Sequence, residues 1–189
     1  MGHAAEVLHL TYQDYLALER QTDTRYEFLD GEAWMMSGGS LRHSALKANV
    51  LTAIATALER GPCRAFDADA KVRVSATGLA TYPDLSVVCG PLERHPEDHN
   101  ALTNPTVLVE VLSPTTERWD RGGKFIHYQQ LASLRHYLLI DQDEARVEHF
   151  ERAASGWHYS VHGPGERVVI AAANITLDIE QIYQNLPDA

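Results

Sequence analysis

The sequence predicts an α/β (α+β) fold in which a central mixed β-sheet is flanked by helices. Two apolar segments rich in Val and Leu, residues 81–90 and 105–114, are bounded by Pro and Gly and are typical of buried strands. Residues 43–60 instead repeat apolar side chains at helical spacing. Strands interspersed with amphipathic helices indicate a sheet covered by helices.

Length, composition and charge narrow the classes of protein. We expect a single domain over residues 1–189, because this length suits one hydrophobic core. The net charge of −10 argues against a broad nucleic-acid footprint but leaves room for a local basic groove. No segment is long enough to cross a membrane, and the first residues lack a signal peptide, so we expect a cytoplasmic protein without membrane contact. Cys63 and Cys89 make no disulfide framework, and reduced thiols are expected.

Two elements are predicted before the long helix. A helix over residues 11–19 begins at Thr11, which with Asp14 has the pattern of a capping box. Alternating residues over 25–36 predict a hairpin, because Asp30-Gly31 is a strong two-residue turn signal.

The long helix over residues 43–60 should end at Gly61-Pro62 and lead into one strand over residues 63–74. Alternation within that strand separates an apolar face from a charged face, which we expect to be solvated or to line a cleft. The charged face consists of Asp67, Asp69, Lys71 and Arg73. Residues 90–104 are polar and contain proline, so they are predicted to form a loop.

The C-terminal half is predicted to contain a helix and then an antiparallel meander. The helix runs from Ser113 to about residue 131, and its apolar contacts come from Trp119, Phe125, Ile126, Tyr128 and Leu131. Gly122-Gly123 within it indicates either a close backbone approach or a kink. Strands over 135–141, 146–151 and 156–162 form the meander, and residues 175–186 close the chain with a strand and a short helix.

Asp84 and Glu110 stand in segments that otherwise predict core strands. A carboxylate in a core costs several kcal/mol unless something pairs with it. Taken singly, Asp84 after a proline could be a turn residue, and Glu110 could face water at a sheet edge. Together they favour a site for a hard divalent cation, which prefers carboxylate oxygens.

The order of these motifs resembles the PD-(D/E)XK nucleases, and more narrowly the Uma family of endonucleases. A Pro-Asp is followed 26 positions later by Glu110, and Asp120 and Lys124 lie in the next helix. The segments that carry the resemblance are Arg25-Tyr-Glu-Phe-Leu-Asp-Gly-Glu32, Arg42-His-Ser44, Tyr82-Pro-Asp-Leu-Ser-Val-Val88, Val109-Glu-Val-Leu-Ser-Pro114 and Leu134-Arg-His-Tyr-Leu-Leu-Ile-Asp141.

The resemblance implies a restriction-endonuclease-like core and Mg²⁺- or Mn²⁺-dependent cleavage of phosphodiester bonds in nucleic acid, with DNA as the expected partner. It implies Asp84 and Glu110 as catalytic metal ligands, completed by the Val111 carbonyl, with Glu27 as an outer or second-metal ligand. Lys124 would orient or activate the attacking water. The motif places its lysine two residues after the glutamate, where this chain has Leu112, so Lys124 would have to replace it from the following helix.

The resemblance also implies three substrate-binding residues, and the expected cleavage of duplexes indicates a pair of subunits. His43 opens the long helix and is expected to contact phosphate, and Ser113 and Asp120 would bind substrate as well. We expect a homodimer, because cleavage of both strands of a duplex needs two sites. Its candidate contacts lie in the meander, at Trp157 and Tyr159.

Two other functions stay open from the sequence. A nuclease fold without cleavage could act by binding nucleic acid, and the acidic balance and the displaced lysine favour that alternative. With the nuclease counted as the first function and the binding protein as the second, a different hydrolase or a structural protein is the third. Metal binding would separate the third from the first two, and a cleavage assay would separate the first from the second.

Overall fold

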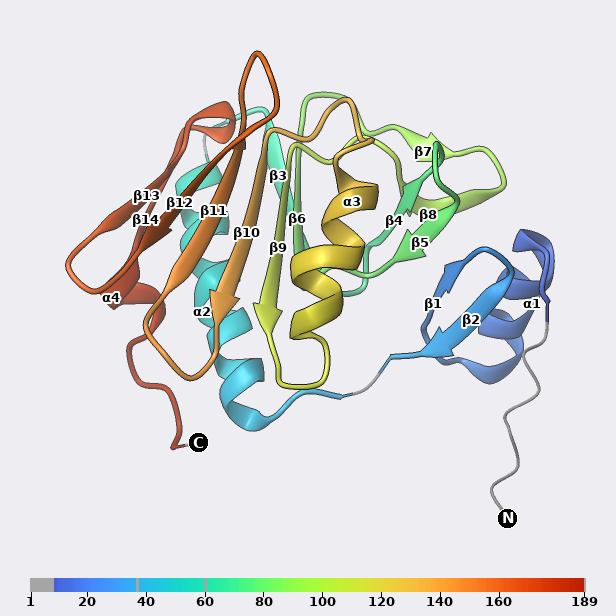
Figure 1. Cartoon of the computed structure of the whole chain (residues 1–189), viewed down its shortest axis with the longest axis horizontal. Coiled ribbons are helices and arrows are strands. Elements are labelled where there is room, and N and C mark those ends of the chain that lie inside the picture. The colour runs from blue at the N-terminus through green and yellow to red at the C-terminus, as the bar shows by residue number, and fades with distance from the viewer. Residues whose placement is uncertain (1–8, 37, 60, 189) are drawn as a thin grey trace.

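A six-stranded mixed sheet forms the centre of the computed structural model, which describes residues 9–36, 38–59 and 61–188 (Figure 1). Its strand order is β12-β11-β10-β9-β6-β3, and β9 and β10 run parallel while the other neighbours are antiparallel. The mixed sheet was predicted. Its strands are β3 (Cys63–Asp67), β6 (Leu85–Cys89), β9 (Val107–Leu112), β10 (His136–Asp141), β11 (Val147–Arg152) and β12 (Trp157–His162).

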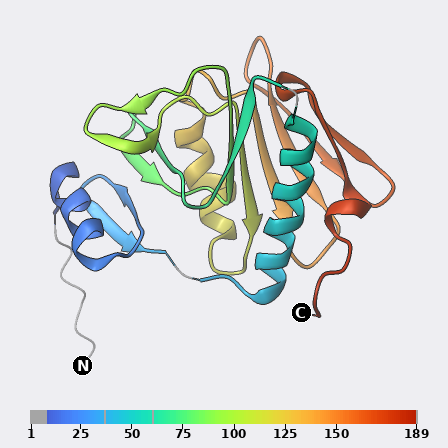
Figure 2. The same ribbon diagram turned by 180° about the vertical axis from the view of Figure 1, so that it is seen from behind.

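One face of this sheet packs against the long helix α2 (Leu41–Leu58), which Figure 2 shows in front of the sheet. The Ser40 hydroxyl caps the helix by accepting from the His43 backbone N–H, at 3.1 Å. Leu46, Val50 and Ile54 are fully buried against the sheet. The same core includes a ribbon and its flanking turns, namely β13 (Arg167–Ile170), η2 (Ala171–Ala173), β14 (Ile175–Asp178) and α4 (Ile179–Ile182).

The opposite face is covered by a short helical segment and a second sheet. The segment is a π-helix η1 (Trp119–Lys124) that continues as α3 (Phe125–Tyr128) and lies in front of the sheet in Figure 1. The second sheet has the order β2-β1-β5-β4-β8-β7. Its strands are β1 (Tyr26–Leu29), β2 (Glu32–Met35), β4 (Lys71–Val74), β5 (Leu79–Thr81), β7 (Arg94–His95) and β8 (Asp98–Leu102).

The alternation within β9 explains the orientation of Glu110. Val107, Val109 and Val111 belong to the core beneath α2, whereas Leu108 and Leu112 belong to the core beneath α3. Because successive strand residues point to opposite faces, Glu110 shares the α3 face with the two leucines.

The N-terminal predictions hold in detail. Helix α1 (Tyr12–Thr22) begins with a complete capping box, because Thr11 and Asp14 each bond the backbone N–H of the other. The hairpin β1-β2 turns at Asp30 and Gly31, which both have positive φ, 51° and 87°. That conformation belongs to the turn in which Asp-Gly is favoured.

The prediction of one strand over residues 63–74 is wrong, because the chain turns between β3 and β4 and changes sheets. The turn closes with a 3.1 Å bond from the Ala70 N–H to the Asp67 carbonyl, and the Asp67 carboxylate accepts from the Asp69 N–H at 3.0 Å. This local bonding by Asp competes with a continuous strand. The charged face is not uniformly solvated either: Lys71 is buried and contacts Glu19 and Asp98, both at 2.6 Å.

Two other predicted elements also differ. Residues 90–104 contain the hairpin β7-β8 and are not only a loop. The helix expected from Ser113 opens there with a turn, in which the Glu117 N–H donates to the Ser113 carbonyl at 2.9 Å, but from Trp119 to Lys124 it is a π-helix. Ile126, expected to pack, is 64% exposed, because its position on α3 faces away from the sheet.

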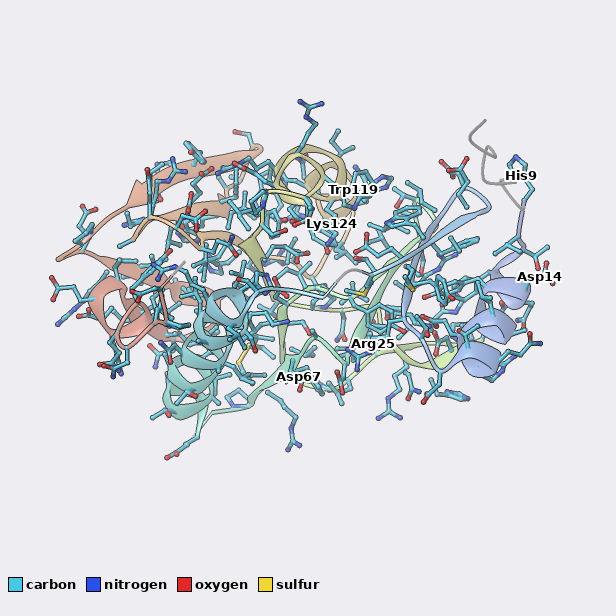
Figure 3. The ribbon with its side chains drawn as sticks, turned by 90° about the horizontal axis from the view of Figure 1, so that it is seen from below. His9, Asp14, Arg25, Asp67, Trp119 and Lys124 are labelled. Carbon is cyan, nitrogen blue, oxygen red and sulfur yellow. A yellow bond between two sulfur atoms is a disulfide. The ribbon has the colours of Figure 1, made fainter. Side chains whose placement is uncertain are left out.

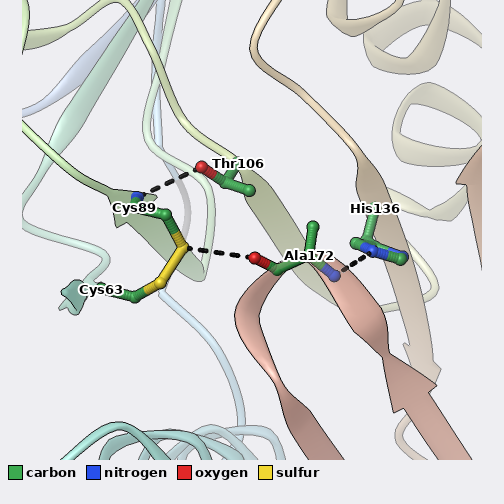
Figure 4. Close-up of a disulfide and its surroundings, with 5 residues drawn as sticks. All are labelled: Cys63, Cys89, Thr106, His136 and Ala172. Carbon is green, nitrogen blue, oxygen red and sulfur yellow. Dashed lines mark hydrogen bonds between the residues drawn. A yellow bond between two sulfur atoms is a disulfide. The ribbon is translucent and has the colours of Figure 1, made fainter. Parts of the chain in front are cut away.

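Cys63 and Cys89 form a disulfide, which corrects the expectation of reduced thiols (Figure 4). The two residues are direct partners across the antiparallel pair β3-β6, a register that their separation in sequence does not reveal. No described helix is long and apolar enough to pass through a lipid bilayer.

Candidate functional site

The pairing of β6 with β9 brings Asp84 and Glu110 together. Asp84 immediately precedes β6, and the register Leu85↔Val109 places it beside Glu110. The Asp84 N–H donates to Glu110 Oε2 at 3.3 Å, and Asp84 Oδ2 accepts from the Val111 N–H at 2.8 Å. Glu110 is 2% exposed, so the alternative of a water-facing edge residue does not hold.

Lys124 lies among three carboxylates from three different elements. Its Nζ is 2.9 Å from Asp120 Oδ1, 3.0 Å from Glu27 Oε1 and 3.2 Å from Glu110 Oε1. Burial acts to lower the pKa of Lys124, but the three carboxylates outweigh it and hold the pKa well above its usual value. The side chain is therefore a permanent cation, and its burial excludes the alternative of an exposed surface charge.

The two central acids have opposite electrostatic environments. Burial raises the pKa of Glu110 well above its usual value, and the nearby carboxylates of Asp120 and Asp84 add to this against the opposing effect of Lys124. Burial also acts to raise the pKa of Asp84, but His43 and Lys47 outweigh it, so the pKa is lowered. Neighbouring acids with separated proton affinities are typical of functional sites.

Helix α2 supplies the groups around Asp84. His43 Nε2 lies 2.9 Å from the Val111 carbonyl oxygen and 3.6 Å from Asp84 Oδ2. Lys47, one helical turn later, places Nζ 3.1 Å from Asp84 Oδ1. A Cβ at Gly39 would lie 2.4 Å from His43 Nδ1, so glycine is needed there for the imidazole to pack.

Glu27 is enclosed by donors on both oxygens. Oε2 accepts from the indole N–H groups of Trp34 and Trp119, each at 3.1 Å. Oε1 accepts from the Thr81 hydroxyl and pairs with Lys124. Because a carboxylate has about four acceptor positions, these four contacts leave none for a cation. The surroundings of Glu27 therefore fit an anchor for Lys124 and do not fit the expected metal ligand.

The acids and the lysine open onto one cavity of about 330 Å³. Ser113 lies in its wall, and its hydroxyl is bonded to those of Thr115 and Thr116 at 3.0 and 2.9 Å. The expected substrate-binding Asp120 is 2% exposed and committed to Lys124. Further lining residues are Glu27, Trp34, Met35, Met36, His43, Tyr82, Asp84, Glu110, Val111 and Trp119.

Charge in this region favours a cation. Four carboxylates gather around two lysines, with Glu27, Asp120 and Glu110 contacting Lys124 and Asp84 contacting Lys47. Among the residues that the structure describes, no three His, Cys, Asp or Glu side chains already form a metal-ligand group. Asp84, Glu110 and the Val111 carbonyl nevertheless share one cavity wall and carry the oxygen donors that Mg²⁺ prefers.

Several residues of the site were missed from the sequence. Lys47 could have been found by its scarcity and its spacing of four from His43. Tyr128 shares a helix face with Lys124 and donates to Glu110 Oε1 at 2.9 Å. Trp34 is the cross-strand partner of Glu27 in the predicted hairpin and could have been found from that pairing. Thr81 and Trp119 had no signal of this kind, because they lie 54 and 92 residues from Glu27. Trp119 and Lys124, from the two ends of η1, lie near each other in Figure 3.

Comparison with known proteins places this arrangement in a family. The Uma2 family model, described as "Putative restriction endonuclease", matches residues 12–180. The Synechocystis protein slr1290 is 31% identical over 178 residues, covering 94% of this chain and 93% of the relative. A second Synechocystis protein, sll1609, is 31% identical over 143 residues, covering 76% and 81%.

A solved structure has the same fold. It is the crystal structure of a protein from Anabaena variabilis described as a putative nuclease belonging to DUF820, with a TM-score of 0.75 and 21% sequence identity. The match covers 92% of this chain and 97% of that one, which supports the predicted restriction-endonuclease-like fold. The chain belongs to the Uma2 family of putative restriction endonucleases.

Proposed function

We propose that the protein is a metal-dependent endonuclease that hydrolyses phosphodiester bonds in nucleic acid, with DNA as substrate, through one restriction-endonuclease-like domain over residues 1–189. The observation that carries this proposal is the meeting of Asp84, Glu110 and Lys124 in one cavity, from the residue before β6, from β9 and from η1. The two acids would hold a metal ion beside the hollow, and that ion and the buried ammonium would together stabilise the negative charge that a phosphodiester gathers in its transition state.

The residues that would hold Mg²⁺ or Mn²⁺ are Asp84, Glu110 and the Val111 carbonyl. When bound, the ion would stabilise negative charge on the phosphate and lower the pKa of a water molecule. His43 already bonds the Val111 carbonyl, and Lys47 already pairs with Asp84. In this proposal both residues of α2 orient the ligands, His43 from the cavity wall and Lys47 from outside the cavity.

Lys124 provides the chain's own positive charge at the reacting group. Glu27 and Asp120 hold its ammonium on either side, which fixes the direction of a flexible side chain. We propose that this ammonium orients the attacking water and stabilises the phosphate. The contacts of Asp120 suit the positioning of Lys124 better than direct substrate binding. His43 and Ser113 remain the proposed substrate contacts that line the cavity.

The test is a cleavage assay on supercoiled plasmid and on single-stranded oligonucleotides, with Mg²⁺, Mn²⁺ or a chelator. We expect metal-stimulated cleavage that falls by about 100-fold or more in Asp84→Asn and Glu110→Gln, because each removes a carboxylate that would hold the metal ion. Glu180→Gln, an exposed acid on α4, is the matched control. Nucleic-acid binding without any metal-stimulated cleavage would instead support a nuclease-fold binding protein.

We further propose a homodimer in a cytoplasmic setting, where the Cys63–Cys89 disulfide would have to resist reduction. Of the two candidate contacts on the edge strand β12, Tyr159 is 51% exposed. Trp157 packs against Phe125 within the chain, with ring centroids 5.3 Å apart. Tyr159 is thus the better contact. A light-scattering mass near that of the 21.1 kDa chain would contradict the dimer.

A further inference from the structure

Part of the cavity wall is aromatic and apolar, which the chemistry of the acids does not require. Trp34, Met35, Met36 and Trp119 line the same cavity as Asp84, Glu110 and Lys124. Trp34 is 36% exposed and Met35 65% exposed. Large apolar side chains exposed next to a polar site usually contact a ligand.

The two indoles are held in fixed orientations. Both N–H groups donate to the same oxygen of Glu27, and the rings meet edge to face with centroids 6.0 Å apart and planes at 79°. The Trp119 ring lies directly over Gly123, where a Cβ would come within 1.8 Å of it. One of the two predicted explanations for Gly122-Gly123, a close approach to the backbone, therefore applies at Gly123. Rigid rings lose little entropy when a flat ligand binds.

The Trp34 ring is also accessible. It lines the cavity that contains the acids and a second hollow formed with Leu29, Asp30, Glu32 and Trp119. The distance from this ring system to the proposed phosphate site is short, because Glu27 bonds both indoles and also contacts Lys124 at 3.0 Å. A ligand that fits both the indole rings and the proposed phosphate site would be planar and apolar at one end and anionic at the other, which describes a nucleotide unit.

We infer that Trp34 and Trp119 form a nucleobase subsite, so that the substrate presents an unpaired base beside the phosphate to be cleaved. The inference rests on the proposed function. A base inside a duplex is already stacked on both sides and cannot reach an indole, whereas an unpaired base can stack on it. Stacking also suits a chain of net charge −10, which has little general attraction for a polyanion.

The test measures binding by tryptophan fluorescence, so it does not depend on cleavage. A Trp157→Phe background removes the only tryptophan outside the cavity. The probes are a 12-residue single-stranded DNA, the same strand with one abasic position, and its blunt duplex, all with Ca²⁺ as a non-cleaving ion. We expect quenching by the single strand with at least 10-fold tighter binding than the duplex, and weakened quenching by the abasic strand.

Two substitutions separate stacking from the loss of the bond to Glu27. Trp34→Ala and Trp34→Phe both remove the indole N–H, but only Phe retains an aromatic face. We expect binding of the single strand to fall about 10-fold in Trp34→Ala and to stay within about 3-fold in Trp34→Phe. Val169→Ala, which trims an exposed apolar side chain outside the cavity, should leave binding unchanged. Melting curves of each variant confirm that it is folded.

The results distinguish this inference from the proposed function. Equal binding of single strand and duplex, or equal weakening by Trp34→Ala and Trp34→Phe, would overturn the subsite. Selective single-strand binding that depends on an aromatic residue at position 34, in a protein that cleaves nothing, would overturn the nuclease and support the subsite.

Discussion

Two of the three lysines in the chain are buried among carboxylates, and the two differ in whether they line a cavity. Lys71 contacts Glu19 and Asp98, both at 2.6 Å, and its ammonium lies 4.8 Å from the centre of the Tyr15 ring. These partners come from α1, which carries Glu19 and Tyr15, and from β8 of the second sheet, which carries Asp98. Lys124 has three carboxylates, and it lines the cavity beside Asp84.

The comparison teaches that burial and pairing alone do not identify a functional lysine. Lys71 is enclosed by aromatic rings and joins α1 to the second sheet, so its charge has no access to a ligand. Lys124 is equally buried but sits where acids exceed cations and an open cavity begins. A bound metal ion would balance excess negative charge next to a hollow.

The largest expected effect is on stability at Lys71. Lys71→Met should lower the free energy of unfolding by about 3–5 kcal/mol, because it leaves Glu19 and Asp98 buried without their cation. Urea unfolding measures the change. Cleavage per folded molecule should match the parent protein at a temperature where both are folded. A loss of cleavage without a loss of stability would contradict the structural role assigned to Lys71.

Lys124→Met should act on the reaction. We expect cleavage to fall by about 10²–10³-fold, equivalent to about 2.7–4 kcal/mol, because the ammonium is the chain's own charge at the phosphate. Its three carboxylate neighbours would also repel one another, so we expect some loss of stability, which Mn²⁺ should partly restore. Undiminished cleavage by the folded variant would return Lys124 to a purely structural role like that of Lys71.

The third prediction concerns how low pH affects the stability of the fold at a buried histidine cluster away from the site. Burial lowers the pKa of His149 to about 4, and the neighbouring His136, His162 and His158 contribute to the shift. The folded state thus prefers the neutral imidazole of His149. The contribution of this residue to stability is fully present above pH 6.5 and is lost as the pH falls toward 4. The shift corresponds to at most about 3 kcal/mol, because solvent partly screens the cluster. Urea unfolding at several pH values should show this slope, and His149→Phe should flatten it.

The smallest expected effect is stabilisation by metal. Mn²⁺ at about 100 times its dissociation constant should add about 2.7 kcal/mol to the stability of the parent protein. Lys71→Met should show the same gain, since its cluster is separate from the proposed ligands, whereas Asp84→Asn should lose it. An equal gain in Asp84→Asn, measured by thermal melting, would place the ion elsewhere.

Many helices and turns of this protein could be predicted from the sequence, because they depend on interactions between residues close together in the chain. Thr11 with Asp14 defined the start of α1, Asp30-Gly31 defined the hairpin turn, and apolar spacing defined α2, because caps, turns and helical periodicity depend on residues a few positions apart. The two acids in core strands and the family resemblance also identified Asp84, Glu110 and Lys124 as residues to be placed together.

Only the tertiary structure decided which distant residues meet. The register of β3 against β6 pairs Cys63 with Cys89, and the turn after β3 sends Lys71 into another sheet toward Glu19 and Asp98. The indole of Trp119 likewise reaches Glu27 from 92 residues along the chain, whereas Trp34 is the hairpin partner of Glu27. Such contacts depend on strand order and sheet register, which arise from packing of the whole chain and leave no periodic signal in the sequence around each residue.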